Sequence, residues 1–171
     1  MRNVFGADEQ TELPIDVLRW VGLAELVLAE ERVAADAEVS VIFVDEQAIT
    51  DLNERFLGGN GPTDVLAFPM DDDVPMGGRQ PDQGGRGPGA PLEPVDPPQI
   101  LGDVVICPMV ALRQAAERQI AVDDELALLV VHGVLHLLNY DHAETDETEK
   151  MQARERELLA RFRSREESDG G

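Results

Sequence analysis

The sequence has little cysteine and no long apolar run. Its single cysteine, Cys107, excludes an internal disulfide, and its apolar setting favours a buried thiol over a redox group. No stretch approaches the roughly 18 consecutive apolar residues of a membrane span, and the amino terminus lacks the basic-then-apolar pattern of a secretory signal. We therefore expect a cytoplasmic protein with no membrane partner.

Positive charge is also scarce, because 35 acidic residues stand against 14 basic ones, for a net charge of −21. Proteins that bind nucleic acid usually present a basic surface to the phosphates, so this balance argues against a broad RNA-binding face. Two explanations stay open. The chain has either an acidic surface with a local positive pocket, made by arginine and a metal ion, or a substrate other than RNA.

The length of 171 residues predicts one domain, which we place at residues 1–163. Within it, residues 70–99 consist mainly of glycine, proline and aspartate and offer little to bury, so we expect a flexible loop there. Residues 164–171 are predicted to form a disordered tail.

Apolar spacing and β-branched runs predict an α+β fold, in which helices cover a small mixed β-sheet. The most apolar helix has no polar face, so it should be buried at the centre. Asp45 is a candidate N-cap of one helix, and Asp123 or Asp124 of the central one. The predicted strands are 1–5, Glu38–Val44, Thr63–Phe68 and Asp103–Cys107, and the predicted helices are Pro14–Arg32, Glu46–Phe56, one opened by Pro108, Glu125–Leu138 and Asp146–Phe162.

All three histidines of the chain lie within eleven residues, at His132, His136 and His142. The four-residue spacing places His132 and His136 on one face of a helix, where two imidazoles can share a cation. His142 can join them only if the chain turns, and Asn139 tolerates the left-handed conformation that ends helices. Three neutral nitrogen ligands would leave the fourth position of a zinc ion to water, which is the arrangement of a catalytic site.

Other interpretations of these histidines stay open. A non-catalytic metal site would need a fourth protein ligand, for which Asp64, Asp141 and Glu144 are candidates. Three buried imidazoles without a metal would need several partners for their ring nitrogens. The spacing matches that of zinc peptidases, but Gly133 stands where those enzymes carry a glutamate base, which argues against peptide hydrolysis. A glycine there indicates close approach of backbone or substrate, as in an open floor under the metal.

The run His132–His142 resembles the signature of the YbeY family of metal-dependent endoribonucleases, which usually have glycine where Asn139 stands. Two further segments resemble that family in order and spacing, Pro62–Pro69 and Leu101–Ile106. The resemblance implies a zinc-dependent endoribonuclease with one Zn²⁺ per chain, specific for single-stranded RNA. It would act in small-subunit (16S) rRNA 3′-end maturation and ribosome quality control, with rRNA, the ribosome or its small subunit, and ribosomal proteins as partners.

One position departs from the family pattern. The family's arginine aligns with Leu57, while this chain carries Arg55 two places earlier. These positions lie on nearly opposite sides of an ideal helix, so Arg55 can supply the missing phosphate contact only if the helix has unwound there. The alternative functions are a metal-stabilised ribosome-assembly factor with little catalysis and another zinc hydrolase.

Overall fold

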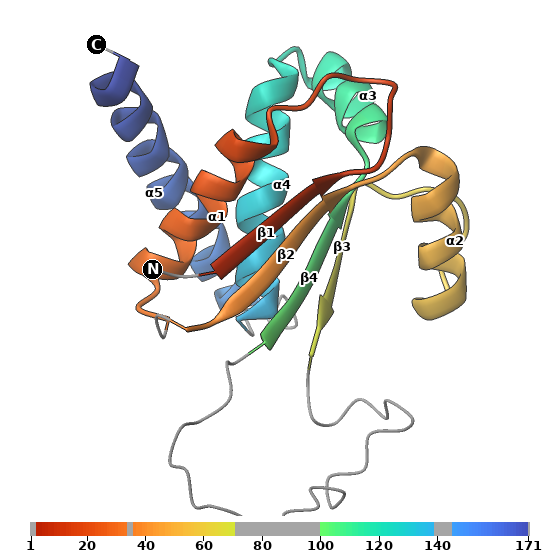
Figure 1. Ribbon diagram of the computed structural model, residues 1–171, viewed down its shortest axis with the longest axis horizontal. Coiled ribbons are helices and arrows are strands. Elements are labelled where there is room, and N and C mark those ends of the chain that lie inside the picture. Colours follow the sequence, from red (N-terminus) through yellow and green to blue (C-terminus); the bar gives the residue numbers. More distant parts are fainter. Residues whose placement is uncertain (1–2, 34–35, 71–99, 139–144, 171) are drawn as a thin grey trace, which may run out of the picture.

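The computed structural model describes residues 3–33, 36–70, 100–138 and 145–170. None of the helices in these ranges has the length and apolar content that crossing a bilayer requires. Along the chain the elements (Figure 1) are β1 (Asn3–Asp8), α1 (Val17–Glu30), β2 (Glu38–Phe43), α2 (Glu46–Phe56), β3 (Val65–Pro69), β4 (Ile100–Ile106), α3 (Pro108–Arg118), α4 (Val122–Leu137) and α5 (Thr145–Gly170).

The sheet has the strand order β1-β2-β4-β3. The pairs β1–β2 and β2–β4 are parallel, and β3 pairs antiparallel with β4 at the far edge. The β-branched strands β2 and β4 occupy the two central positions, where both of their edges are hydrogen-bonded. This mixed sheet with its helices confirms the predicted α+β fold.

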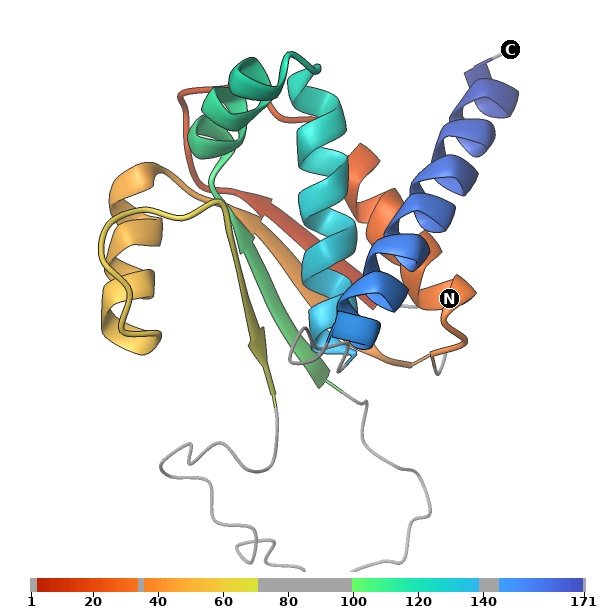
Figure 2. The ribbon, with the colours of Figure 1, turned by 180° about the vertical axis from the view of Figure 1, so that it is seen from behind.

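Helices cover the two faces of the sheet unequally. Helices α1, α4 and α5 lie on one face, and α2 lies on the other (Figures 1 and 2). Alternate residues of β4 serve the two sides, because Val104 and Ile106 join the large core while Val105 joins the smaller core with Ile49 of α2. In α4, ten of the 16 residues are buried, which confirms the prediction of a buried central helix.

Two predicted helix starts are right, at Glu46 of α2 and at Pro108 of α3, and two are wrong. Asp45 caps α2 as predicted, because its carboxylate accepts the backbone N–H of Ala48 at 2.9 Å. The start of α1 is at Val17, after the N-cap Asp16, so Pro14 precedes the helix and does not lie in its first turn. The loop side chain of Asp16, which can accept backbone N–H groups, explains the later start.

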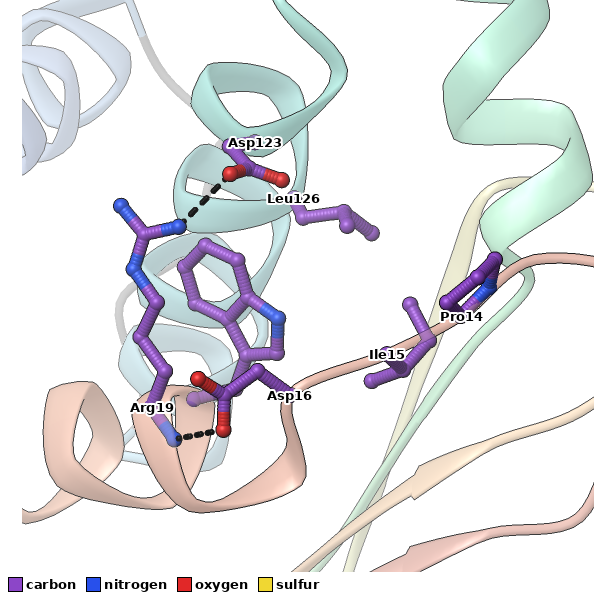
Figure 3. Close-up of a pocket in the computed structure, with 7 residues that line it drawn as sticks. Pro14, Ile15, Asp16, Arg19, Asp123 and Leu126 are labelled. Atoms are coloured by element: carbon purple, nitrogen blue, oxygen red, sulfur yellow. Dashed lines mark hydrogen bonds and ion pairs between the residues drawn. The ribbon is translucent and has the colours of Figure 1, made fainter.

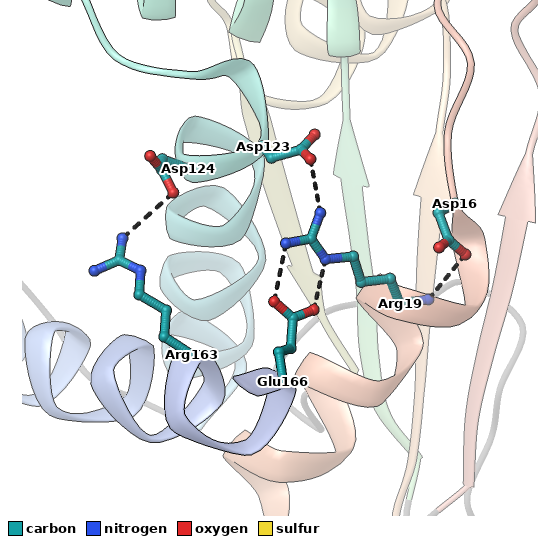
Figure 4. Close-up of polar contacts among 6 residues, drawn as sticks. All are labelled: Asp16, Arg19, Asp123, Asp124, Arg163 and Glu166. Atoms are coloured by element: carbon teal, nitrogen blue, oxygen red, sulfur yellow. Dashed lines mark hydrogen bonds and ion pairs between the residues drawn. The ribbon is translucent and has the colours of Figure 1, made fainter. Parts of the chain in front are cut away.

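The N-cap predicted for α4 at Asp123 or Asp124 is also wrong. The helix begins at Val122, so both aspartates lie in its first turn, where carboxylates interact favourably with the helix dipole. Their side chains bind arginines of α1 and α5 instead of the backbone of their own helix (Figure 4).

Helix α5 continues to Gly170, so the prediction of a disordered tail is wrong for residues 164–170. Arg19 of α1 gives the physical reason. Its guanidinium donates to both carboxylate oxygens of Glu166, at 2.6 and 3.0 Å, and to Asp123 of α4 at 2.7 Å (Figure 4). A paired, two-point contact of this kind orders the end of α5, which offers few apolar side chains of its own.

Gly102 allows β3 and β4 to approach each other closely. Its φ of +140° is a conformation that other residues rarely adopt, and an added Cβ would lie 2.3 Å from the backbone oxygen of Phe68. The same Cβ would lie 2.9 Å from the side chain of Leu137, in the last turn of α4. This glycine therefore sets the distance between the sheet and the carboxyl end of α4.

We expect Gly102→Ala to lower the free energy of unfolding by roughly 2–4 kcal/mol, because the substitution adds both backbone strain and a clash with backbone atoms. The control is Gly22→Ala in α1, where a Cβ meets no atom within 4 Å. That change should raise the stability by about 0.5–1 kcal/mol. Denaturant unfolding measures both, and equal effects of the two substitutions would contradict the packing argument.

We expect Glu166→Gln to lower stability by about 1 kcal/mol, because it removes a charged two-point contact with Arg19. Thermal melting at low and high salt checks this, and the loss should shrink as salt rises. The matched control is Glu167→Gln, whose exposed side chain should leave the melting temperature unchanged. A salt-independent loss would show that the ion pair is not its cause.

Candidate metal centre

Two of the predicted ligands lie close together near the carboxyl end of α4. Nε2 of His132 is 3.1 Å from Nε2 of His136, and the two rings are inclined by 72° with their centroids 4.6 Å apart. Two imidazole nitrogens that bind one tetrahedral zinc ion, each at about 2.0–2.1 Å, are about 3.3 Å apart. The pair therefore fits a shared cation without a change of backbone.

The third predicted ligand, His142, lies outside the described residues, as do Asn139, Asp141 and Glu144. Within the described ranges, no three side chains of histidine, cysteine, aspartate or glutamate come together in a way that could hold a metal ion. The described part of the chain thus brings together two of the three predicted ligands, and metal binding by all three stays a prediction.

A carboxylate that the sequence analysis missed binds the first histidine. Oε2 of Glu155 lies 2.6 Å from Nδ1 of His132, and Glu155 is only 7% exposed. The sequence did hold a signal for it. Glu155 falls at helical spacing with Met151, Leu158 and Phe162, the buried stripe of α5, so its side chain shares their inward face.

Gly133 has a different role from the one predicted. An added Cβ there would lie 2.5 Å from Cγ1 of Val104, so the glycine permits close packing of α4 on β4. Gly133 is buried in α4, and the side chain that lies closest to it is that of Val104, a residue of the core. The prediction of an open floor under the metal is therefore wrong.

Asp64, a candidate fourth ligand, belongs to a network near the other end of α4. Its carboxylate accepts the N–H of Val65 at 2.7 Å. With its amide nitrogen turned toward the acids, Gln114 donates to Asp64 at 3.0 Å and to Glu125 at 2.9 Å. Glu125 lies in the first turn of α4, about two turns before His132. The structure does not bring Asp64 to the histidine pair.

Burial dominates the electrostatics of this network. It raises the pKa of Glu125, although Arg118 donates to that carboxylate at 3.0 Å and acts in the opposite direction. The negative charge of Asp64 raises the pKa of Glu125 further. These acids thus tie β3, α3 and the start of α4 together, which is a structural role.

Arg55 is exposed in the last turn of α2, and α2 packs on the face of the sheet opposite α4. The helix continues to Phe56 and has Leu57 as its C-cap, so it has not unwound at Arg55. The condition under which Arg55 could take the place of a cation at position 57 is therefore not met. The structure therefore does not support the prediction that Arg55 supplies this phosphate contact.

A pocket of about 460 Å³ lies where the start of α1 meets the start of α4 (Figure 3). Asp123 and Leu126 place it at the opposite end of α4 from His136. Its polar groups are already paired, because Arg19 binds Asp123 and Asp16 caps α1. We assign no chemistry to it. Its lining residues are Pro14, Ile15, Asp16, Arg19, Trp20, Asp123 and Leu126.

Comparisons with known proteins confirm the resemblance to the YbeY family. The family model described as endoribonuclease YbeY matches residues 7–163. The endoribonuclease YbeY of Thermobifida fusca is 46% identical over 154 residues, which cover 90% of each chain. That of Salinispora tropica is 44% identical and aligns with 95% of this chain and 94% of its own length. A Thermotoga maritima protein with a known solution structure has a TM-score of 0.54 and 26% identity, covering 96% of this chain and 93% of that one.

Proposed function

The chain belongs to the endoribonuclease YbeY family, and we propose that it is a zinc-dependent endoribonuclease specific for single-stranded RNA. Its substrate would be small-subunit rRNA, which it would cleave during maturation of the 3′ end. The enzyme would also act in ribosome quality control. Family membership supports RNA as the substrate. The observation that supports metal-dependent chemistry is the pair of histidine nitrogens 3.1 Å apart on α4.

His132 and His136 would hold one zinc ion per chain, with His142 as the third ligand. When bound, zinc acts as a Lewis acid toward a phosphate and lowers the pKa of water toward about 7. The protein contributes a rigid support, because α4 is buried between the sheet and its neighbouring helices. The side chain of His132 is 30% exposed, so the site is both anchored from the protein side and open to a substrate.

The acidic surface bears on how RNA would reach this site. A net charge of −21 opposes wide contact with phosphates, which favours a few local contacts over a long basic groove. We propose that basic ribosomal proteins dock on the acidic surface and present the RNA strand.

The same net charge favours a second candidate function, a metal-stabilised ribosome-assembly factor with little catalysis. Such a protein would need the zinc site and the docking surface but no RNA turnover. The two candidates therefore differ in one measurable property, cleavage of RNA by the purified protein.

We expect the purified chain to contain one zinc ion and to cleave single-stranded RNA until a chelator is added. His136→Ala should reduce cleavage to the level of the chelated wild type, because it removes one of the two paired nitrogens. Elemental analysis and gel assays measure these outcomes. Re-addition of zinc to the chelated wild type is the control, and it should restore cleavage, while circular dichroism checks that the variant is folded.

Metal-dependent cleavage by His136→Ala would contradict the role of this histidine. Zinc without RNA turnover, together with co-sedimentation with ribosomal particles, would favour the assembly factor. Hydrolysis of a peptide or a small ester instead of RNA would favour another zinc hydrolase.

We expect Arg55→Ala to leave kcat/KM for single-stranded RNA unchanged, because α2 is still helical at position 55 and does not place this arginine where the family has its own. Arg165→Ala, which removes an exposed arginine from α5, should leave kcat/KM unchanged. Leu57→Arg supplies the family arginine at its own position. That variant should raise kcat/KM up to about tenfold, the effect of one charged hydrogen bond to a phosphate. A loss of activity in Arg55→Ala without this increase would show that position 55 makes the contact.

A further inference from the structure

Glu155 is a buried carboxylate, and such a group is costly to bury unless it is hydrogen-bonded. The partner that the structure gives it is Nδ1 of His132, at 2.6 Å. A distance this short is typical of a hydrogen bond that involves a charged group. The contact therefore offsets the cost of burying the acid and ties α5 to the histidine pair.

The chemistry of the bond sets which nitrogen of His132 carries a proton. An ionised carboxylate only accepts hydrogen bonds, so Nδ1 of His132 must be the donor. A neutral imidazole carries one proton, which leaves Nε2 of His132 with a lone pair. Nε2 is the atom that faces His136 at 3.1 Å. The carboxylate thus selects the tautomer that presents a metal-binding lone pair at the shared point.

The position of Glu155 is fixed by its own helix. Met151 and Leu158, one turn before it and one turn after it, are fully buried in the large core. Arg154, the preceding residue, donates to the carboxylate of Glu31 and to the backbone oxygen of Glu30 at 3.1 Å, both at the end of α1. Apolar packing and polar contacts therefore hold the carboxylate against the ring from a rigid element.

We propose that Glu155 is a positioning residue for the metal centre. It holds His132 with Nδ1 protonated, keeps the plane of the ring fixed, and thereby strengthens zinc binding through Nε2. This proposal rests on the proposed function only in taking zinc as the ion that the histidines bind. Carboxylates that accept a hydrogen bond from a metal-binding histidine typically contribute about 10–100-fold to metal affinity.

Zinc affinity of the 171-residue protein, measured by competition with a chelating dye, tests the proposal. We expect Glu155→Ala to weaken binding by about 10–100-fold. Glu155→Gln keeps a carbonyl oxygen that can accept the Nδ1 proton but loses the charge, so its affinity should lie between those of the wild type and Glu155→Ala. The matched control is Glu157→Gln, two positions along α5, because its side chain is 58% exposed and its affinity should be unchanged.

A second measurement needs no metal and no activity. Nitrogen-15 NMR of the metal-free protein reports which ring nitrogen of His132 is protonated. We expect the Nδ1–H form in the wild type and in Glu155→Gln, and a mixture with the Nε2–H form in Glu155→Ala. Loss of packing alone would change thermal stability but would not redistribute the proton between the two nitrogens.

Wild-type zinc affinity in both Glu155 variants would overturn the proposal, and so would a wild-type protein with His132 protonated on Nε2. Should Glu155→Ala fail to fold, Glu155→Gln still decides the affinity comparison. A failure of the proposed function would give a different experimental result. In that case, zinc binding would depend on Glu155 as expected, while the wild type would cleave no RNA.

Discussion

Helix α4 can lie on the sheet only as closely as Gly133 and Val104 allow. A side chain at Gly133 would meet Val104 at 2.5 Å, so the bare backbone lets the helix reach the centre of the sheet. Gly102 likewise permits close packing near the carboxyl end of α4, where Leu137 and the backbone of β3 leave no room for a Cβ. Because α4 is fixed at both places, its two histidines are presented by a rigid support and not by a loop.

The scarcity of positive charge has a structural counterpart. Many of the basic residues are used to join helices, and the ion pairs link α1, α4 and α5 on one side and α2 and α3 on the other. Those arginines are paired with carboxylates and are thus less able to bind phosphates. This pairing supports the proposal that contacts with RNA are few and local. Within the described residues, the arginines in ion pairs are Arg19, Arg113, Arg118, Arg154, Arg161 and Arg163.

Local patterns in the sequence predicted what depends on neighbours along the chain. The bounds of α2, the burial of α4 and the pairing of His132 with His136 follow from spacing and capping, and all three are found in the structure. Features that depend on contacts between helices were missed. Glu155 is buried because α5 packs on α4, and the end of α5 is helical because Arg19 of α1 binds it. The spacing of Glu155 along α5 indicates its inward face but not its partner, and the pairing of Arg19 with Glu166 cannot be predicted from either helix alone.

The two missed features together show that α5 supports the histidine pair of α4. It carries Glu155 behind the histidine pair, and its far end is bound by Arg19 eleven residues later, about 16 Å along the axis. A straight helix is stiff and moves as one body. The contacts of α5 with α1 therefore also hold the carboxylate of Glu155 against His132. In the proposed metal centre, the histidine pair would supply the metal-binding atoms, and the charged helix α5 would determine how the ring of His132 is oriented. The proposed metal centre therefore depends on two helices, of which only one is recognisable from histidine spacing.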